Sequence, residues 1–450
     1  MRARSRRGLG QRIVAGIALA GMALPAWSFD LLDAYRNALA SDATFLAARS
    51  ALAAVRENVP QARAGLLPQV NLSVQRTRNQ TENTSTQFGI PITRDSRYAA
   101  EAGALSLRQP LYRRAGWTQL SFAEAQVAAA EAGFEKDRQD AGLRVAEAYF
   151  TVLLAQSQVR ALQAQLEAVT AQQKLAERAF EAGQGTRTDI DDARAQAQQA
   201  KAVLLDANYN LDNARRTLAA LVGSTPAALA DVVPERLPLV PPQPADLDHW
   251  LQQMEAANPE LAALRHQVEM AKRDIARQSA GHHPTLDLIA ARQYGSNETN
   301  VSLNTKYTTD YVGVQLGVPI FSGGGVSAAV RQAEANLDKT RFQFEAARKR
   351  LGVDTQKFFY GVTQGIDKVR AYEASLEAAE QAVLSSRKGF LAGSRTQVDV
   401  LNALQRRADA TRALYQARYE FLLNRLRLAA AAGELDEDLL ARVNAALAGP

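Results

Sequence analysis

The sequence is an internal duplication, and this feature limits the fold more than any other. The segment "GLLPQVNLSV" (65–74) matches "GHHPTLDLIA" (281–290) in the same spacing of glycine, proline and alternating residues. Later in each half, Asp189 matches Asp399 beside a glycine-containing break in a long helical pattern. A repeat of this length implies two copies of one structural unit. Each half is therefore predicted to run helix, strand, polar connection, strand, long helix, break and long helix.

The duplication divides the chain into five predicted parts. These are a signal peptide at 1–28, a first repeat at 29–229, a proline-rich linker at 230–248, a second repeat at 249–433 and a C-terminal tail at 434–450. The predicted strands lie at about 69–78, 99–110, 285–294 and 310–320, and the predicted long helices at about 115–181, 187–222, 325–391 and 397–432.

The first 28 residues indicate export. A basic start precedes the apolar run "IVAGIALAGMAL" (13–24), and small residues follow in "PAWS", so we expect a cleaved secretory signal with Phe29 as the mature start. The formal net charge is +6, and residues 1–28 hold five arginines and no acid, which leaves 6 − 5 = +1 for the mature chain. With a net charge this close to zero, the basic pI of the whole sequence is no reason to expect nucleic acid as a partner, and we predict none.

The chain has no cysteine. In an exported protein this excludes a disulfide framework, a thiolate metal site and a lipid-anchored N-terminal cysteine. Any attachment to a membrane must then come from the fold.

The helical segments have an unusually regular apolar pattern. Apolar and small residues alternate steps of three and four, which is the spacing of a coiled-coil seam. The seam residues of the first long helix are Val145, Ala148, Val152, Ala155, Val159, Leu162, Leu166, Val169, Gln173, Ala176 and Phe180. No proline interrupts residues 115–181, so a helix here would reach roughly 100 Å. A rod of this length indicates a tube or stalk.

The strand segments alternate apolar and polar residues over roughly ten residues, which suits an outer-membrane barrel. The connections at 79–96 and 295–310 are polar and free of helical pattern, and we expect them to be outward-facing loops. Two hairpins of a soluble domain are the alternative. Four strands cannot close a barrel, since the smallest have about eight. Two chains would supply eight strands and three chains twelve, and a trimer of duplicated chains would be pseudo-six-fold.

The whole mature chain resembles the TolC family of outer-membrane channel-tunnels, in particular its type I secretion branch. The resemblance is carried by "GLLPQVNLSV", "GVPIFSGG", "AGSRTQVDVLNA", and "NYNLDNARRTLAALVG" with its partner "RYEFLLNRLRLAAAAG". It implies an α+β, mainly α, fold: a homotrimer with a 12-stranded barrel in outer-membrane lipid and an α-helical tunnel through the periplasm. A mixed belt would be formed by about 223–248 and 434–450.

The same resemblance implies partners. The duct would be passive, and a periplasmic adaptor would join it to an inner-membrane transporter of the ABC or RND type. The rival class is a non-channel periplasmic coiled coil, either structural or an adaptor.

The breaks are predicted to be helix–turn–helix corners, with Gly183, Gly185 and Gly393 supplying backbone freedom. By resemblance, these corners form a gate at the periplasmic end of the tunnel.

The resemblance also implies which side chains link the gate. Arg395 stands at the position of the gate arginine, and Asp189 at that of the aspartate that accepts from it across the subunit boundary. Gln172 matches a glutamine that pairs with a tyrosine, but that position is Phe390, so the link must be absent or replaced by packing. Arg387 stands where the family can have an acid. The alternative for Arg395 and Asp189 is helix-end charge and capping.

Asp399 and Asn402 follow on the same helix. Three copies of Asp399 would form a carboxylate ring at the constriction, which would favour cations. The family can have a second aspartate at the position of Asn402, so a single ring predicts a milder preference. The alternative for Asp399 is a solvated helix face.

Neither an enzyme nor a cofactor is indicated. "FSGGGVSAAV" lacks the lysine and hydroxyl spacing of a P-loop. His282 and His283 have no third ligand at metal spacing, so we predict no metal site and no catalytic residue.

Overall fold

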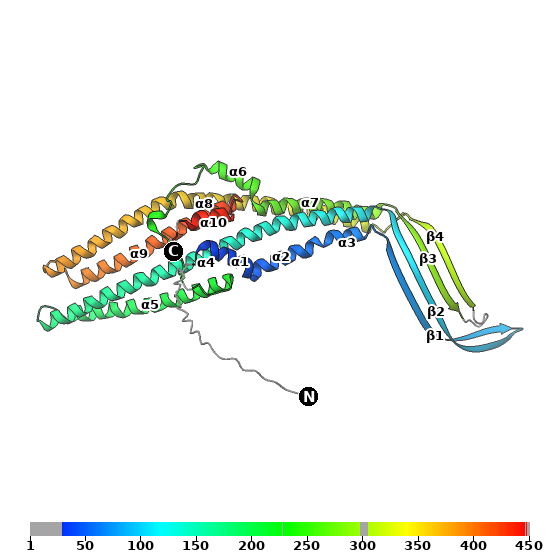
Figure 1. The fold of residues 1–450 in the computed structure, drawn as a ribbon, viewed down its shortest axis with the longest axis horizontal. Coiled ribbons are helices and arrows are strands. Elements are labelled where there is room, and N and C mark those ends of the chain that lie inside the picture. The colour runs from blue at the N-terminus through cyan, green and yellow to red at the C-terminus, as the bar shows by residue number, and fades with distance from the viewer. Residues whose placement is uncertain (1–28, 227, 298–304, 446, 448–450) are drawn as a thin grey trace, which may run out of the picture.

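The computed structural model describes residues 29–226, 228–297, 305–445 and 447, and the predicted signal peptide lies outside them. The molecule is elongated, with a bundle of long helices at one end and a four-stranded sheet at the other (Figure 1). The first repeat contains α1 (Leu31–Ser41), α2 (Ala43–Arg56), α3 (Asn58–Ala64), β1 (Gln69–Gln87), β2 (Ile90–Arg113), α4 (Arg114–Glu181) and α5 (Arg187–Val222). The remainder contains η1 (Pro234–Arg236), α6 (Leu247–Ala257), α7 (Pro259–Ser279), η2 (Ala280–His282), β3 (Thr285–Asn297), β4 (Thr305–Gly317), α8 (Gly325–Leu391), α9 (Gln397–Ala431) and α10 (Glu437–Asn444).

The duplication is visible in the lengths of the long helices. Helices α4 and α8 have 68 and 67 residues, and α5 and α9 have 36 and 35. Neither α4 nor α8 contains a proline, so nothing in the backbone interrupts them. Within the described residues, no single helix is long and apolar enough to cross a membrane, and only α1 with the helical stretch 43–64, bent by 52°, meets that test as a pair.

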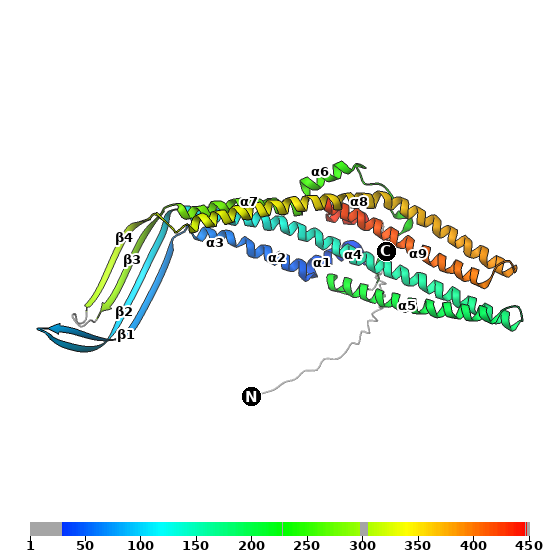
Figure 2. The same cartoon turned by 180° about the vertical axis from the view of Figure 1, so that it is seen from behind.

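The helices form a single curved layer with two open edges. Toward the helical tip the order across the layer is α5, α4, α9 and α8, and toward the sheet it is α2 with α3, then α4, α7 and α8 (Figures 1 and 2). Close approach of α8 to α9 depends on glycine. A Cβ on Gly361 would lie 2.7 Å from Nδ2 of Asn424, and one on Gly365 would lie 3.3 Å from Cδ2 of Phe421. Small residues therefore set the spacing of this coiled coil.

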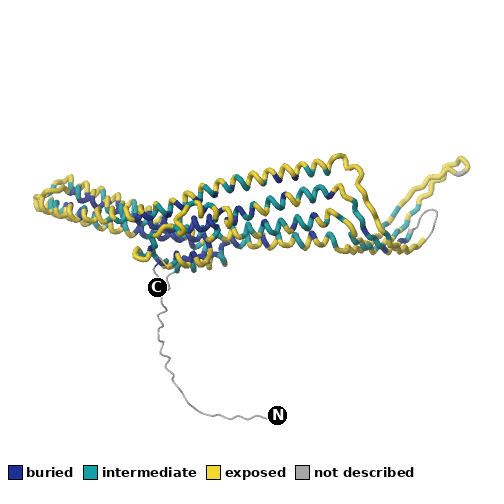
Figure 3. The backbone as a smooth tube through the Cα atoms, turned by 90° about the horizontal axis from the view of Figure 1, so that it is seen from above, coloured by how far each residue is buried: buried dark blue, intermediate teal, exposed yellow. Residues whose placement is uncertain are grey.

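The largest core lies at mid-length, where the short helices α1 and α10 pack onto the long ones (Figure 3). Its largest fully buried side chains include Tyr149, Phe150, Phe421, Leu422 and Leu426. Away from this region only narrow strips of each long helix are buried, because a one-layer wall leaves its two surfaces open.

Two buried tyrosines tie the segment around Ala230 to the long helices. The Tyr149 hydroxyl lies 3.0 Å from the Phe29 carbonyl oxygen and 2.9 Å from that of Ala230. The Tyr419 hydroxyl donates to Oδ1 of Asp231 at 2.9 Å. Burial and the nearby Asp231 carboxylate raise the pKa of Tyr419, so the hydroxyl keeps its proton. The segment that follows α5 is thereby held against α4 and α9.

The sheet is antiparallel in the order β1-β2-β3-β4, with β1 and β4 at its edges. The registers place Val70 opposite Leu107, Leu107 opposite Ala290, and Ala290 opposite Val312, so these residues share one face. That face carries Val70, Leu72, Val74, Leu105, Leu107, Leu286, Leu288, Val312, Val314 and Leu316. The opposite face carries Asn71, Ser73, Gln75, Thr77, Ser106, Gln293 and Thr309. The sheet therefore has one apolar and one polar face.

A buried carboxylate stabilises the junction of sheet and helices. The side chain of Asp287 in β3 is 3% exposed and lies 2.5 Å from Nη2 of Arg108 and 2.9 Å from Nη2 of Arg113. Two arginines compensate for its desolvation, and Arg113 is the residue directly before α4.

The predicted strand bounds in the first repeat are wrong. Strands β1 and β2 extend through the polar stretch 79–96, which was predicted to be a loop, and only Phe88 and Gly89 form the turn between them. The prediction failed because it required one continuous apolar face, whereas this part of the ribbon has apolar residues only near its turn and is otherwise polar and rich in threonine, which favours strands. In the second repeat β3 extends to Asn297, and β4 spans Thr305–Gly317 rather than 310–320. Part of the predicted second loop, 298–304, lies outside the described residues.

Candidate functional site

The two helical corners at the end of the bundle have the same backbone. Gly183 and Gly393 both have φ of 73°, and each ends a helix through a hydrogen bond from its N–H to a carbonyl three residues earlier. This left-handed conformation is readily available only to glycine. Gly185 has a different role, because a Cβ there would lie 3.1 Å from the backbone nitrogen of Phe180. The corner thus depends on glycine for both conformation and close approach.

Each corner leads into a helix with a reciprocal capping box. Oδ2 of Asp189 accepts from the N–H and the hydroxyl of Thr186, at 3.0 and 2.6 Å, and the Asp189 N–H donates to the Thr186 hydroxyl. Thr396 and Asp399 repeat this arrangement at the start of α9. Asp189 and Asp399 therefore both cap helices. For Asp189, capping is the role that the sequence analysis gave as the alternative to a link in the gate.

The capping bonds change the acidity of Asp399. Hydrogen bonds from the backbone and the hydroxyl of Thr396, with a smaller contribution from Arg395, hold the pKa of Asp399 below its ordinary value of 3.8. Its carboxylate is therefore ionised throughout the neutral range.

Arg395 is an exposed cation at the tip. Its Nη1 lies 3.8 Å from Oδ1 of Asp399, and its side chain is 60% exposed. The aliphatic part lies against Gly389, where a Cβ would come within 2.6 Å of the Arg395 Cγ. Within the described residues of one chain, Arg395 pairs with Asp399 and not with Asp189. The predicted link from Arg395 to Asp189 joins two different subunits, and it stays a prediction.

Gln172 is buried and paired, but not with Phe390. Its Nε2 donates to Oε1 of Gln397 at 2.6 Å, and Nε2 of Gln397 donates to the Gln172 backbone oxygen at 3.1 Å. Gln172 is 4% exposed and Gln397 is 2% exposed. The sequence pattern predicts Gln173 as the seam residue of this turn, whereas the structure buries Gln172 against Gln397. Gln397 stands three residues before Val400, an apolar residue buried in the same helix. This three-residue spacing is the sequence signal that indicates a buried position for Gln397.

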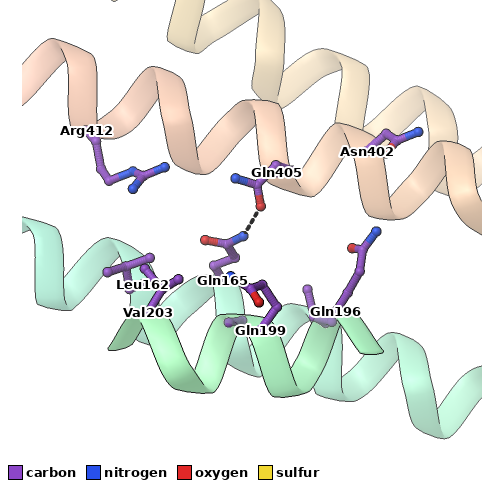
Figure 4. A pocket seen from close by; sticks show the side chains of 10 residues that line it. Leu162, Gln165, Gln196, Gln199, Val203, Asn402, Gln405 and Arg412 are labelled. Atoms are coloured by element: carbon purple, nitrogen blue, oxygen red, sulfur yellow. Dashed lines mark hydrogen bonds between the residues drawn. The ribbon is translucent and has the colours of Figure 1, made fainter. Parts of the chain in front are cut away.

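A second amide pair lies two helical turns away. Nε2 of Gln165 on α4 donates to Oε1 of Gln405 on α9 (Figure 4). The pair borders a cavity of about 190 Å³ between α4, α5 and α9. The lining residues are Leu162, Gln165, Val169, Gln196, Gln199, Ala200, Val203, Asn402, Gln405 and Arg412. The predicted site residue Asn402 therefore lines a cavity within the chain.

Phe390 makes apolar contacts and, having no hydroxyl, no side-chain hydrogen bond. It lies against a small core near the tip made of Val169, Ala193, Ala197, Val383, Val400, Leu401, Ala403 and Leu404. Arg387, three residues earlier, is exposed. The amide pairs and this core together join the α4–α5 corner to the α8–α9 corner.

Comparison with known proteins places the whole arrangement in a family. The family model described as outer membrane efflux protein matches residues 34–224 and 250–434, which are the two repeats. The alkaline protease secretion protein AprF of Pseudomonas aeruginosa is 35% identical over 414 residues, covering 92% of this chain and 86% of that protein. The outer membrane protein TolC of Vibrio cholerae is 31% identical over 96% of both chains.

Solved structures agree in fold. The Campylobacter jejuni CmeC outer membrane channel superposes with a TM-score of 0.76, at 15% identity over 92% of this chain and 89% of that one. The Vibrio cholerae protein VceC has a TM-score of 0.73, at 20% identity over 90% of this chain and 97% of its own.

Proposed function

The chain belongs to the outer membrane efflux protein family, and from that membership we propose that three copies assemble into one gated exit duct. It is an outer-membrane channel of the TolC type, with a tunnel that extends into the periplasm.

The two open edges of the fold support assembly of several copies into a ring. One side of the chain ends in β1 and α5, and the other side ends in β4 and α8. Unpaired strand edges must be covered. Joining the β4–α8 edge of one copy to the β1–α5 edge of the next gives a head-to-tail interface, which closes into a ring if the rotation permits.

Three copies supply suitable numbers of strands for the barrel and of long helices for the tunnel. They supply twelve strands, which is within the range of outer-membrane barrels, and an equal number of long helices around the tunnel. The apolar sheet face would contact lipid. The polar face, with Asn71, Ser73 and Gln75, would line the water-filled lumen.

The tip of the helical bundle is the proposed gate. Both capping bonds of Asp189 end on Oδ2, so its Oδ1 can accept from Arg395 of a neighbouring copy without loss of the cap. Arg395 is exposed and held near Asp399 by its packing on Gly389. The Gln172–Gln397 pair takes the place of the link for which Phe390 lacks a hydroxyl. Asp399, ionised at neutral pH, would form the cation-preferring ring with Asn402 beside it.

We propose secreted protein as the cargo, delivered through a periplasmic adaptor from an inner-membrane transporter. This rests on two relatives, the alkaline protease secretion protein AprF and the proteases secretion protein PrtF of Dickeya chrysanthemi, at 35% and 32% identity. The TolC resemblance leaves small compounds as the second candidate cargo.

The test is deletion of the gene followed by two measurements. Loss of one or more exported proteins from the culture medium, with drug susceptibility unchanged, supports protein export. Increased drug susceptibility with an unchanged set of secreted proteins would assign the duct to efflux instead. A heat-modifiable trimer in the outer-membrane fraction is expected in either case, and its absence would contradict the ring.

A further inference from the structure

The β1–β2 ribbon extends well beyond the rest of the sheet (Figure 1). Pairing of β2 with β3 ends at Glu101–Ser296, whereas pairing of β2 with β1 continues from Ala100–Thr77 to Ile90–Gln87. This free part of the ribbon is about 35 Å long at 3.3 Å per residue. Among the described residues, no third strand supports it.

The turn of this ribbon is apolar. Phe88 is 99% exposed, Ile90 is 65% exposed and Ile92 is 45% exposed. Phe88 also has a φ of 50°, a conformation that bulky residues rarely adopt. The remainder of the free ribbon is polar and charged, with Glu82, Arg94, Asp95 and Arg97. A small apolar group is thus presented at the end of a polar stem.

The two isoleucines are on the polar face of the sheet. The β1–β2 register runs without a shift from Gln69–Arg108 to Gln87–Ile90, so side chains alternate between the faces throughout. Ile92 lies opposite Ser85 and shares its face with Ser106, which lies opposite Asn71. In a barrel this face lines the lumen, so Ile90 and Ile92 belong to the face that would border the pore.

Insertion of this tip into lipid is disfavoured. The apolar face ends in two charged pairs, Arg76–Glu101 at 3.3 Å and Arg292–Asp310 at 3.6 Å. In the proposed barrel these pairs would mark the outer limit of the lipid-facing band, and the ribbon tip lies beyond Arg76–Glu101 along β1 and β2. A residue that contacts lipid would also be expected on the other face, with Val70 and Leu72.

We propose that the Phe88, Ile90 and Ile92 side chains of three copies meet over the pore axis and close the outer mouth of the duct. The inference rests on the proposed trimeric ring. Each isolated ribbon is marginally stable, and contact among three apolar tips buries their exposed surface. A hydrophobic constriction of this kind excludes water and ions without any charged latch. The duct then has a closure at its outer end that is independent of the corners at the other end.

The first test is disulfide cross-linking between subunits. Because the chain has no cysteine, any disulfide in a single-cysteine variant must form between the introduced residues. Phe88→Cys and Ile92→Cys are expected to form disulfide-linked pairs of subunits under mild oxidation in intact cells. Thr93→Cys is the matched control, because it stands on the same ribbon but on the opposite face. Trimers that are heat-modifiable yet show no more cross-linking at Phe88 or Ile92 than at Thr93 would overturn the closure. Absence of the trimer would instead contradict the ring on which it rests.

The second test measures access from outside. Gln75→Cys places a thiol on the lumen face, to be labelled by a bulky, membrane-impermeant maleimide added to intact cells. Adding Phe88→Ser, Ile90→Ser and Ile92→Ser is expected to raise the labelling rate by about tenfold, since loss of the apolar contacts opens the mouth. The control combines Gln75→Cys with Thr84→Ser and Thr93→Ser, a conservative change to the pair on the other face. Equal rates in the two backgrounds would overturn the proposal.

Discussion

Nε2 of Gln172 donates to Oε1 of Gln397 at 2.6 Å, and the two side chains are among the most buried polar groups of the chain. The pair connects α4 to the first residue of α9, directly after the corner that carries Arg395. A buried amide pair within a coiled coil favours one register, since any displacement leaves donors without partners. The α8–α9 corner is therefore held in one position relative to α4.

Gln397→Leu is expected to lower the free energy of unfolding by about 1–3 kcal/mol, because it leaves the Gln172 amide buried and unpaired. The channel should also conduct more in a planar bilayer, since the corner loses its register. Gln172→Leu combined with Gln397→Leu removes both partners and should recover much of the stability. Gln173→Leu is the control, because its partner Glu177 is on the same helix at 2.9 Å. Additive losses in the double variant would show that the two glutamines are not coupled.

Arg395→Gln is expected to increase conductance and vancomycin sensitivity, because it removes the cation of the proposed inter-subunit link. Asp189→Asn should have the same effect. Thr186→Ala separates gating from capping: it breaks the capping box but leaves the Asp189 charge, and should cost about 0.5–2 kcal/mol of stability with little leakage. If Arg395→Gln and Asp189→Asn both leak no more than the unmodified channel, these two residues do not hold the gate closed.

Cation preference is expected to stay constant from pH 7 down to about pH 4 and to decline only at lower pH. The pKa of Asp399 is held below 3.8 by its hydrogen bonds to Thr396, so the proposed carboxylate ring would stay charged until the pH falls through that lowered value. Reversal potentials across a salt gradient measure this. Asp399→Asn should abolish the pH dependence, and an anion preference in the unmodified channel would contradict the ring.

Tyr419→Phe is expected to lower stability by about 1–2 kcal/mol, since Asp231 loses one of its hydrogen-bond donors in a partly buried network. Thermal unfolding of the detergent-solubilised protein measures the change. Tyr415→Phe is the matched control, because Tyr415 stacks on Tyr419 with ring centroids 6.4 Å apart. Equal losses in the two variants would indicate a packing effect rather than the hydrogen bond.

The sequence predicted most of the helical structure closely, because its signals are local. The predicted helix at 187–222 coincides with α5, and that at 325–391 coincides with α8. Gly183 and Gly393 were found as corner residues because both halves break at the same place. The matching of Asp189 with Asp399 also has a local cause, since each is the third residue of its helix and completes a capping box with the threonine directly before that helix.

What the sequence determined by itself was the duplication, the long uninterrupted helices, the two faces of the sheet near the helices and the corners at the tip. Each follows from residue periodicity or from the conformational limits of glycine and proline, which act over a few positions. Only the tertiary structure decided the partner of Gln172, because Gln397 is 225 residues away along the chain and either corner offers polar side chains. It also decided that the stretch at 79–96 is a paired ribbon, with its isoleucines on the polar face of the sheet. Backbone pairing across a hairpin stabilises strands that lack an apolar face, and no hydrophobic pattern encodes it.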